Sequence, residues 1–141
     1  MEKFYSSERN VQILIVLLKA HKIRKIVASP GTTNLCLVGS LQQDPYFEIY
    51  SSVDERSAAY IACGMAAESG EPVALSCTGA TASRNYVSGL TEAFYRKLPI
   101  LAITSSQHVG RIGQLCPQVI DRSNPMNDIV KMSVQISTVH D

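Results

Sequence analysis

The sequence predicts an α/β domain of three layers, in which helices cover both faces of a central parallel sheet. Two observations support this prediction. Short apolar runs alternate with longer helix-like segments, and Gly, Pro or small polar residues separate them. The apolar runs are continuous rather than alternating, as expected for strands with both faces covered. A chain of 141 residues has the usual length of one domain.

Helices are expected at residues 7–20, 32–41, 54–69 and from the end of a small polar loop at 78–85 to about residue 96. Ser6 or Ser7 could cap the first helix. Pro45 blocks continuation of the second, and Gly70 is a common residue just beyond a helix end.

Strands are expected at residues 24–29, 47–52, 72–77 and 99–104, with a weaker short helix at 124–131 and a last strand at 133–138. Right-handed crossovers place all strand-to-helix loops at one edge of such a sheet, and ligands bind at that edge. Functional residues are therefore expected in four loops, at 30–33, 53–56, 78–85 and 105–108.

Composition excludes several classes of function. A net charge of +1 argues against nucleic acid and anionic membrane surfaces as partners. The apolar run at residues 11–18 is too short to span a bilayer, and no membrane partner is expected. The four cysteines show no CxxC or Cys/His ligand spacing, so we expect no metal site, no disulfide framework and a cytoplasmic location.

Glu55 is the first candidate functional residue, because it follows a predicted strand and opens a helix at the ligand edge. An alternative stays open: Ser52 and Glu55 have the spacing of a capping box, in which Glu55 only satisfies a backbone N–H.

Two small polar turns are further candidates, although neither is specific alone. Pro30-Gly31-Thr32 ends the first strand, and as a turn with a helix cap it needs no other role. The run Thr78-Gly79-Ala80-Thr81 offers N–H groups and hydroxyls at a helix start, a possible anion site, but matches neither a P-loop nor GxGxxG. Residues 58–67 are mostly small, which suits packing on the domain's own sheet or against a second subunit equally well.

Residues 54–104, DERSAAYIACGMAAESGEPVALSCTGATASRNYVSGLTEAFYRKLPILAIT, closely resemble the pyrimidine-binding (PYR) domain of thiamine-diphosphate-dependent enzymes. The resemblance extends over about residues 8–139 and includes the PGTTN turn and the CPQVID stretch, where Val119 stands at a position that is usually Glu. Within the family it is most similar to 2-succinyl-5-enolpyruvyl-6-hydroxy-3-cyclohexene-1-carboxylate synthase, and then to acetolactate synthase-like enzymes. The synthase carries an Arg in this turn that helps hold an anionic substrate, and Thr33 stands in its place here.

The resemblance implies a thiamin-diphosphate-binding fold in which the Glu55 carboxylate hydrogen-bonds N1′ of the cofactor and promotes loss of the thiazolium C2 proton. The residues that the resemblance places around the cofactor or substrate are Pro30, Gly31, Thr32, Thr78, Gly79, Thr81, Asn85 and Gln118.

The resemblance also implies partners. The family's GDG motif, which holds Mg²⁺ and the diphosphate, is missing, so residues 1–141 are expected to form a single PYR domain that is inactive alone. A diphosphate-binding domain of the same enzyme or of a partner subunit, a homo-oligomer and a 2-oxo acid substrate are expected with it. A non-catalytic PYR-like module for assembly or nucleotide binding remains the alternative.

Overall fold

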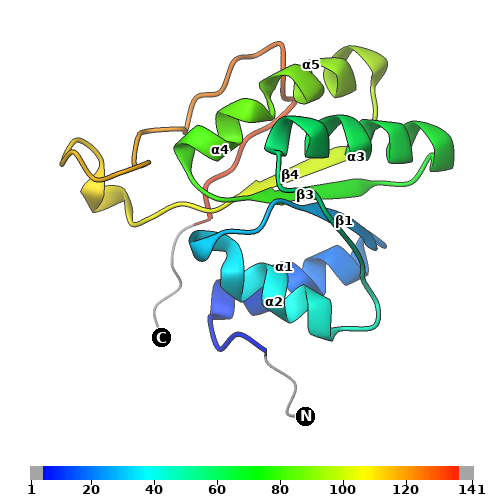
Figure 1. Ribbon diagram of the computed structural model, residues 1–141, viewed down its shortest axis with the longest axis horizontal. Helices are drawn as coiled ribbons and strands as arrows, with labels where there is room; N and C mark the ends of the chain where they lie inside the picture. Colours follow the sequence, from blue (N-terminus) through cyan, green and yellow to red (C-terminus); the bar gives the residue numbers. More distant parts are fainter. Residues whose placement is uncertain (1–4, 137–141) are drawn as a thin grey trace.

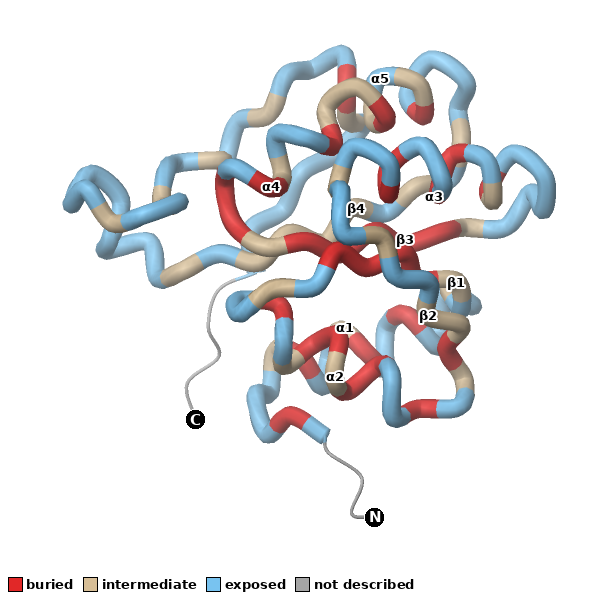
Figure 2. Tube along the Cα trace, viewed as in Figure 1, coloured by how far each residue is buried: buried red, intermediate tan, exposed pale blue. Residues whose placement is uncertain are grey.

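A computed structural model of the protein describes residues 5–136 and contains a four-stranded parallel sheet. The strands are β1 (Lys25–Ala28), β2 (Glu48–Ser51), β3 (Val73–Cys77) and β4 (Ile100–Thr104). They lie in the order β2-β1-β3-β4, all pairs are parallel, and every residue of β3 is buried (Figure 2). Each strand lies within one residue of its predicted limits at either end, because continuous apolar runs between turn residues define it.

Helices cover both faces of the sheet (Figure 1). On one face lie α1 (Arg9–Ala20) and α2 (Leu35–Gln43), and on the other lie α3 (Glu55–Ser69), α4 (Ala80–Asn85) and α5 (Val87–Arg96). Two short 3₁₀ helices, η1 (Thr32–Asn34) and η2 (Val109–Arg111), follow β1 and β4. The predicted three-layer α/β/α fold is therefore confirmed.

The strand order places a reversal of the chain between β1 and β3. From β1 the chain passes through α2 to β2 on one side, and from β2 it crosses back through α3 to β3 on the other side of β1. Right-handed crossovers in opposite directions put α2 and α3 on opposite faces. The crevice beyond the carboxyl ends of strands at such a reversal is where open α/β sheets bind ligands.

Each face of the sheet has its own apolar core, and small residues dominate the one under α3. Leu18, Ile26 and Leu41 are fully buried between the sheet and the pair α1 and α2. On the other face the buried residues include Ala58, Ala59, Ala62, Ala66, Leu75 and Tyr86. The short side chains let α3 lie close to the sheet, which fixes the position of its first residue.

Two predictions about helix starts are wrong. The N-cap of α1 is Glu8, without a side-chain capping bond; Ser6 lies two residues before it, and its hydroxyl accepts from Glu8 N (3.1 Å) rather than from a helical N–H. The predicted loop at residues 78–85 is helical from Ala80 onward, because alanines favour helix and Gly79 serves as its N-cap.

Two predictions near the end of the chain are also wrong within the described residues. No helix forms over 124–131, and only a turn at 127–129 remains. Residues 133–136 form no strand, and residues 137 and 138 of that prediction lie outside the described range. Val134 and Ile136 of this segment are exposed, and residues 133–136 pair with no strand of the sheet.

Candidate cofactor site

Glu55 is the first residue of α3, after the short loop 52–54 that follows β2, and its carboxylate does not cap the helix. Asp54 is the N-cap: its Oδ2 accepts a hydrogen bond from Ser57 N (2.7 Å). Hydrogen bonds from the Ser57 hydroxyl and backbone N–H lower the pKa of Asp54. Ser52 Oγ donates to Asp54 O (3.0 Å), so the expected capping box is wrong, because Asp caps as well as Ser and lies next to the first helical residue.

The Glu55 carboxylate instead faces the end of α4. Asn85 Nδ2 donates to Glu55 Oε2 at 3.4 Å, a long hydrogen bond between two side chains 30 residues apart. Thr81 lies on the first turn of the same helix and is exposed. The structure thus brings two of the predicted site residues into contact and places the third on the helix that supplies one of them.

A cleft of about 370 Å³ opens at the carboxyl ends of β1 and β3, the reversal point of the sheet. Its volume is within the range of small-molecule sites. The predicted site residues that line it are Pro30, Gly31, Thr32, Thr78, Gly79 and Gln118. Glu55, Thr81 and Asn85 are not among its lining residues. The predicted residues therefore form two groups, one in the cleft and one around the start of α3.

The turn after β1 forms one wall of the cleft, and the buried Asn34 holds it. Asn34 Oδ1 accepts from Gly31 N (2.9 Å), while its Nδ2 donates to Ser29 O (3.1 Å) and Ser76 Oγ (3.2 Å). This side chain ties the end of β1 to β3. Gly31 also lies so close to Thr78 that a Cβ on Gly31 would be 2.2 Å from Thr78 Cγ2. Sequence reasoning missed Asn34, although an amide directly after a Pro-Gly turn is a signal for such a role.

Gln118 comes from the segment after η2 and lies against the start of α4. Its carbonyl accepts from Ala80 N (3.3 Å), and a Cβ on Gly79 would be only 3.2 Å from the same oxygen. The backbone of Gln118 has φ 61°, in the left-handed region that L residues rarely adopt. Strain of this kind persists only where the surroundings impose it, and it gathers at functional sites.

Residues after β4 complete the cleft. The sequence predicted functional residues in the loop at 105–108 but did not identify individual ones. Thr33 Oγ1 and Ser105 Oγ are 2.6 Å apart, and Ser105 N donates to Cys77 O (3.1 Å). Behind this wall the Arg122 guanidinium donates to Ser105 O (2.8 Å) and Thr104 Oγ1 (3.1 Å). Burial lowers the pKa of Arg122. The other lining residues are Ser106, Gln107 and Pro117.

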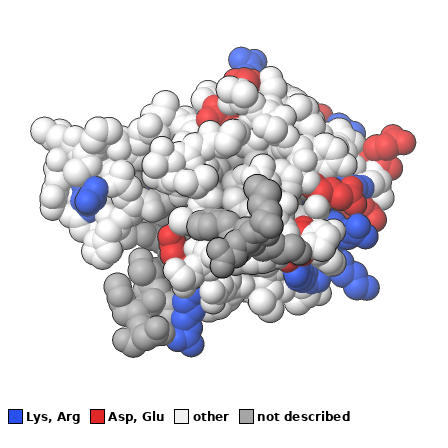
Figure 3. Space-filling view, turned by 60° about the horizontal axis from the view of Figure 1, so that its bottom comes forward, with Lys and Arg blue, Asp and Glu red and all other residues white. Residues whose placement is uncertain are grey.

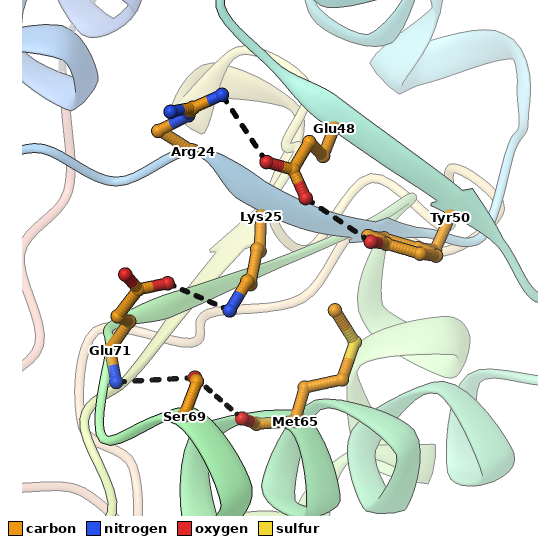
Figure 4. Close-up of polar contacts among 7 residues, drawn as sticks. All are labelled: Arg24, Lys25, Glu48, Tyr50, Met65, Ser69 and Glu71. Carbon is orange, nitrogen blue, oxygen red and sulfur yellow. Dashed lines mark hydrogen bonds and ion pairs between the residues drawn. The ribbon is translucent and has the colours of Figure 1, made fainter.

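The cleft is lined entirely by uncharged residues. Ion pairs lie at the opposite, amino-end edge of the sheet, where Lys25 Nζ is 2.7 Å from Glu71 Oε2 and Arg24 Nη2 is 3.3 Å from Glu48 Oε1 (Figure 4). Figure 3 shows most charged side chains of its face gathered toward one end of the molecule. Hydroxyls, amides and backbone groups are therefore what this cleft offers to a ligand.

The small residues of α3 pack inside the domain. Ala58, Ala59, Ala62, Cys63 and Ala66 are buried, and Gly89 of α5 lies so near that a Cβ there would be 2.4 Å from Ala59 Cβ. Of the two readings left open by the sequence, packing on the domain's own elements is correct for these five residues. The outer surface of the same helix exposes Tyr60 and Ile61.

Residues 9–126 match the family of thiamine pyrophosphate enzymes, N-terminal TPP binding domain. The chain belongs to this family. Two curated relatives are 2-succinyl-5-enolpyruvyl-6-hydroxy-3-cyclohexene-1-carboxylate synthases: that of Phocaeicola vulgatus is 38% identical over 136 residues, and that of Porphyromonas gingivalis is 41% identical over 131 residues. These alignments cover 96% and 93% of this chain but 24% and 23% of the relatives. The TPP-binding domain thus spans about a quarter of their length.

A solved structure shares the fold of this TPP-binding domain. The thiamine diphosphate-dependent 4-hydroxybenzoylformate decarboxylase of Rhodococcus jostii superimposes with a TM-score of 0.72 over 80% of this chain and 21% of that enzyme, at 20% identity. At that identity the likeness shows the fold alone.

The site residues suit the aminopyrimidine of thiamine pyrophosphate better than its diphosphate. A carboxylate held by an amide matches the hydrogen-bonding groups of an aminopyrimidine, and the separate cleft offers neutral polar groups. Within residues 5–136 no three His, Cys, Asp or Glu side chains gather to hold a metal ion. In that same part of the chain no helix is long and apolar enough to cross a membrane.

Proposed function

We propose that this TPP-binding domain holds the aminopyrimidine of thiamine diphosphate and that Glu55 is the carboxylate that activates it. The whole enzyme would be a decarboxylase or carboligase acting on a 2-oxo acid. The observation that carries the proposal is the Glu55 carboxylate, which begins α3 at the ligand edge, leaves capping to Asp54 and is held by Asn85.

Each group of site residues has its own part in the proposal. Glu55 shares a proton with the pyrimidine ring, and Asn85 fixes the carboxylate in position. The cleft residues would surround the ring and the neighbouring part of the substrate with uncharged donors and acceptors. When bound, the cofactor supplies the electron sink for decarboxylation.

The diphosphate and Mg²⁺ would be bound by a separate diphosphate-binding domain, of the same enzyme or of a partner subunit. Two observations support this. Mg²⁺ prefers carboxylates together with phosphate oxygens, and residues 5–136 contain no suitable cluster. In addition, no Gly-Asp pair occurs in the sequence, so the family's GDG motif is absent from it.

We also propose that the enzyme is a cytoplasmic homo-oligomer. The outer faces of α3 and α5 expose Tyr60, Ile61, Phe94 and Tyr95, a surface that suits contact with another domain or subunit. The four cysteines are unpaired, as in proteins of reducing compartments. Sedimentation of the complete enzyme tests the oligomer, and a monomer at all concentrations would contradict it.

Exchange of the cofactor's C2 proton for deuterium tests the role of Glu55. In the complete enzyme, Glu55→Gln should slow this exchange by orders of magnitude while leaving folding stability almost unchanged, because Asp54 caps α3. Glu68→Gln, an exposed residue near the other end of the same helix, is the matched control and should leave exchange unchanged. Normal exchange in the Glu55→Gln enzyme would contradict the proposal and favour a non-catalytic module.

A further inference from the structure

Arg122 is a partly buried cation without an acidic partner. Its Nη1 donates to Thr104 Oγ1 (3.1 Å), and its Nη2 donates to Ser105 O (2.8 Å). It takes part in none of the ion pairs found within residues 5–136. Partial burial of a guanidinium costs free energy, which an uncharged side chain of similar length would avoid. The two hydrogen bonds to the end of β4 are therefore what the guanidinium contributes at this position.

Ser105 is joined to three separate parts of the domain. Its carbonyl accepts from Arg122, and its N–H donates to Cys77 O (3.1 Å), which extends the pairing of β3 with β4 one residue beyond the strand. Its hydroxyl oxygen lies 2.6 Å from Thr33 Oγ1 of η1. Because hydrogen bonds from an ionised donor are stronger than those between neutral groups, Arg122 holds the backbone of Ser105 in place.

A wall bridge, the hydrogen bond between the hydroxyls of Thr33 and Ser105, joins two sides of the cleft. Thr33 follows β1 and Ser105 follows β4, and these two strands pair with β3 on opposite sides. Two strand spacings, about 10 Å in all, separate β1 from β4, so the bridge spans the carboxyl end of β3. Both bridge residues line the cleft, whereas Arg122 does not. The bridge therefore fixes the separation of the two walls, and Arg122 acts on the cleft through Ser105.

The two ends of the wall bridge are held differently. Thr33 precedes the buried Asn34, whose amide is bonded to Gly31 N and to Ser76 Oγ of β3, so this end is anchored in the core. The Ser105 end lies just beyond β4, which is last in the strand order of the described sheet. Its outer anchor is Arg122, 17 residues further along the chain. Loss of Arg122 should therefore loosen one end of the bridge only.

We propose that Arg122 is a positioning residue for substrate selection: its two hydrogen bonds fix Ser105, so that the wall bridge limits the width of the cleft. This rests on the proposed function, in which the cleft surrounds part of the substrate. A cleft of fixed width discriminates between substrates by the size of the group that it must enclose. Loss of the bridge lets the walls move apart, and larger substrates then gain relative to smaller ones.

The ratio of kcat/KM for 2-oxohexanoate to that for pyruvate, measured in the complete enzyme, tests this role. Arg122→Met keeps an unbranched side chain and removes both donors, while Thr33→Val removes the bridge hydroxyl at nearly constant shape. Each should raise the ratio by about fivefold, the scale of one lost hydrogen bond. Arg122→Lys keeps one charged donor and should give an intermediate ratio. Arg96→Met, on α5, is the matched control and should give the wild-type ratio.

A double variant and hydrogen exchange show whether the two residues act through the same bridge. Arg122→Met combined with Thr33→Val should raise the ratio no further than either change alone. Hydrogen–deuterium exchange of the Ser105 amide, followed by mass spectrometry without cofactor, should be faster than wild type in both single variants. This amide is the one that donates to Cys77 O, and it reports the position of the wall independently of turnover.

Exchange of the cofactor's C2 proton separates positioning from a general structural defect. It should be normal in Arg122→Met, because no hydrogen bond in the described residues joins Glu55 to the wall bridge. A wild-type substrate ratio in Arg122→Met, multiplied effects in the double variant or unchanged exchange of the Ser105 amide overturns the inference, even when Glu55→Gln abolishes C2 exchange and the proposed function stands. Normal C2 exchange in Glu55→Gln overturns both.

Discussion

The contact between Gly89 and Ala59 makes a sharp prediction about folding stability. Gly89→Ala would place a Cβ 2.4 Å from Ala59 Cβ and 3.1 Å from its carbonyl carbon, so α5 must move away from α3. Overpacking of this kind costs about 1–3 kcal/mol, while the better helix propensity of Ala returns about 1 kcal/mol. We expect a net destabilisation of up to about 2 kcal/mol.

Gly64 provides a matched control in the facing helix. It is an exposed position of α3, and a Cβ there would meet nothing within 4 Å. Gly64→Ala should therefore stabilise the chain by up to about 1 kcal/mol through helix propensity alone. Urea unfolding followed by circular dichroism should move the midpoints of the two variants in opposite directions. If both shift the same way, α5 does not press on α3 as described.

Three further predictions concern the site. Gly31→Ala should perturb the cleft by clashing with the Thr78 methyl group, and adding Thr78→Ser should restore stability, as a double-mutant cycle would show; simple additivity would contradict the contact. Hydrogen bonds from Ser57 lower the pKa of Asp54, so the stability that its charge contributes is present above about pH 4 and is lost as pH falls through the lower folded-state pKa. The stability advantage of wild type over Asp54→Asn should therefore fade at acid pH. A difference in unfolding free energy that stays constant with pH would refute this. The 141-residue chain should show no micromolar binding of thiamine diphosphate and Mg²⁺ by calorimetry, whereas tight binding would reveal a diphosphate site within it.

The sequence was sufficient to predict the fold class and the limits of the four strands. Three of the strands, β1, β3 and β4, are mainly apolar runs with turn residues on both sides, and this signal is local. The order β2-β1-β3-β4 is not local, because it depends on which side of β1 each crossover passes. For that reason the loops at the ligand edge could be identified from the sequence, while the location of the cleft between β1 and β3 required the structure.

Side-chain partners were the least predictable part of the site. The spacing of Ser52 and Glu55 fits a capping box, yet Asp54 caps the helix, and only the three-dimensional competition between neighbouring caps decides this. Asn34 acts through a contact with Ser76, which is distant in sequence, and it belongs to no pattern with a known spacing.

The division between cleft and carboxylate follows from the two crossovers on one face of the sheet. The α3 crossover begins beyond edge strand β2, so Glu55 starts away from the cleft at β1 and β3, and the next crossover returns through α4 to bring Asn85 against it. The hydroxyls of Thr33 and Ser105, on two walls of the cleft, hydrogen-bond each other. Within the described residues no hydrogen bond joins either of them to Glu55. Substitutions in those walls can therefore change what the cleft accepts while the carboxylate keeps its place.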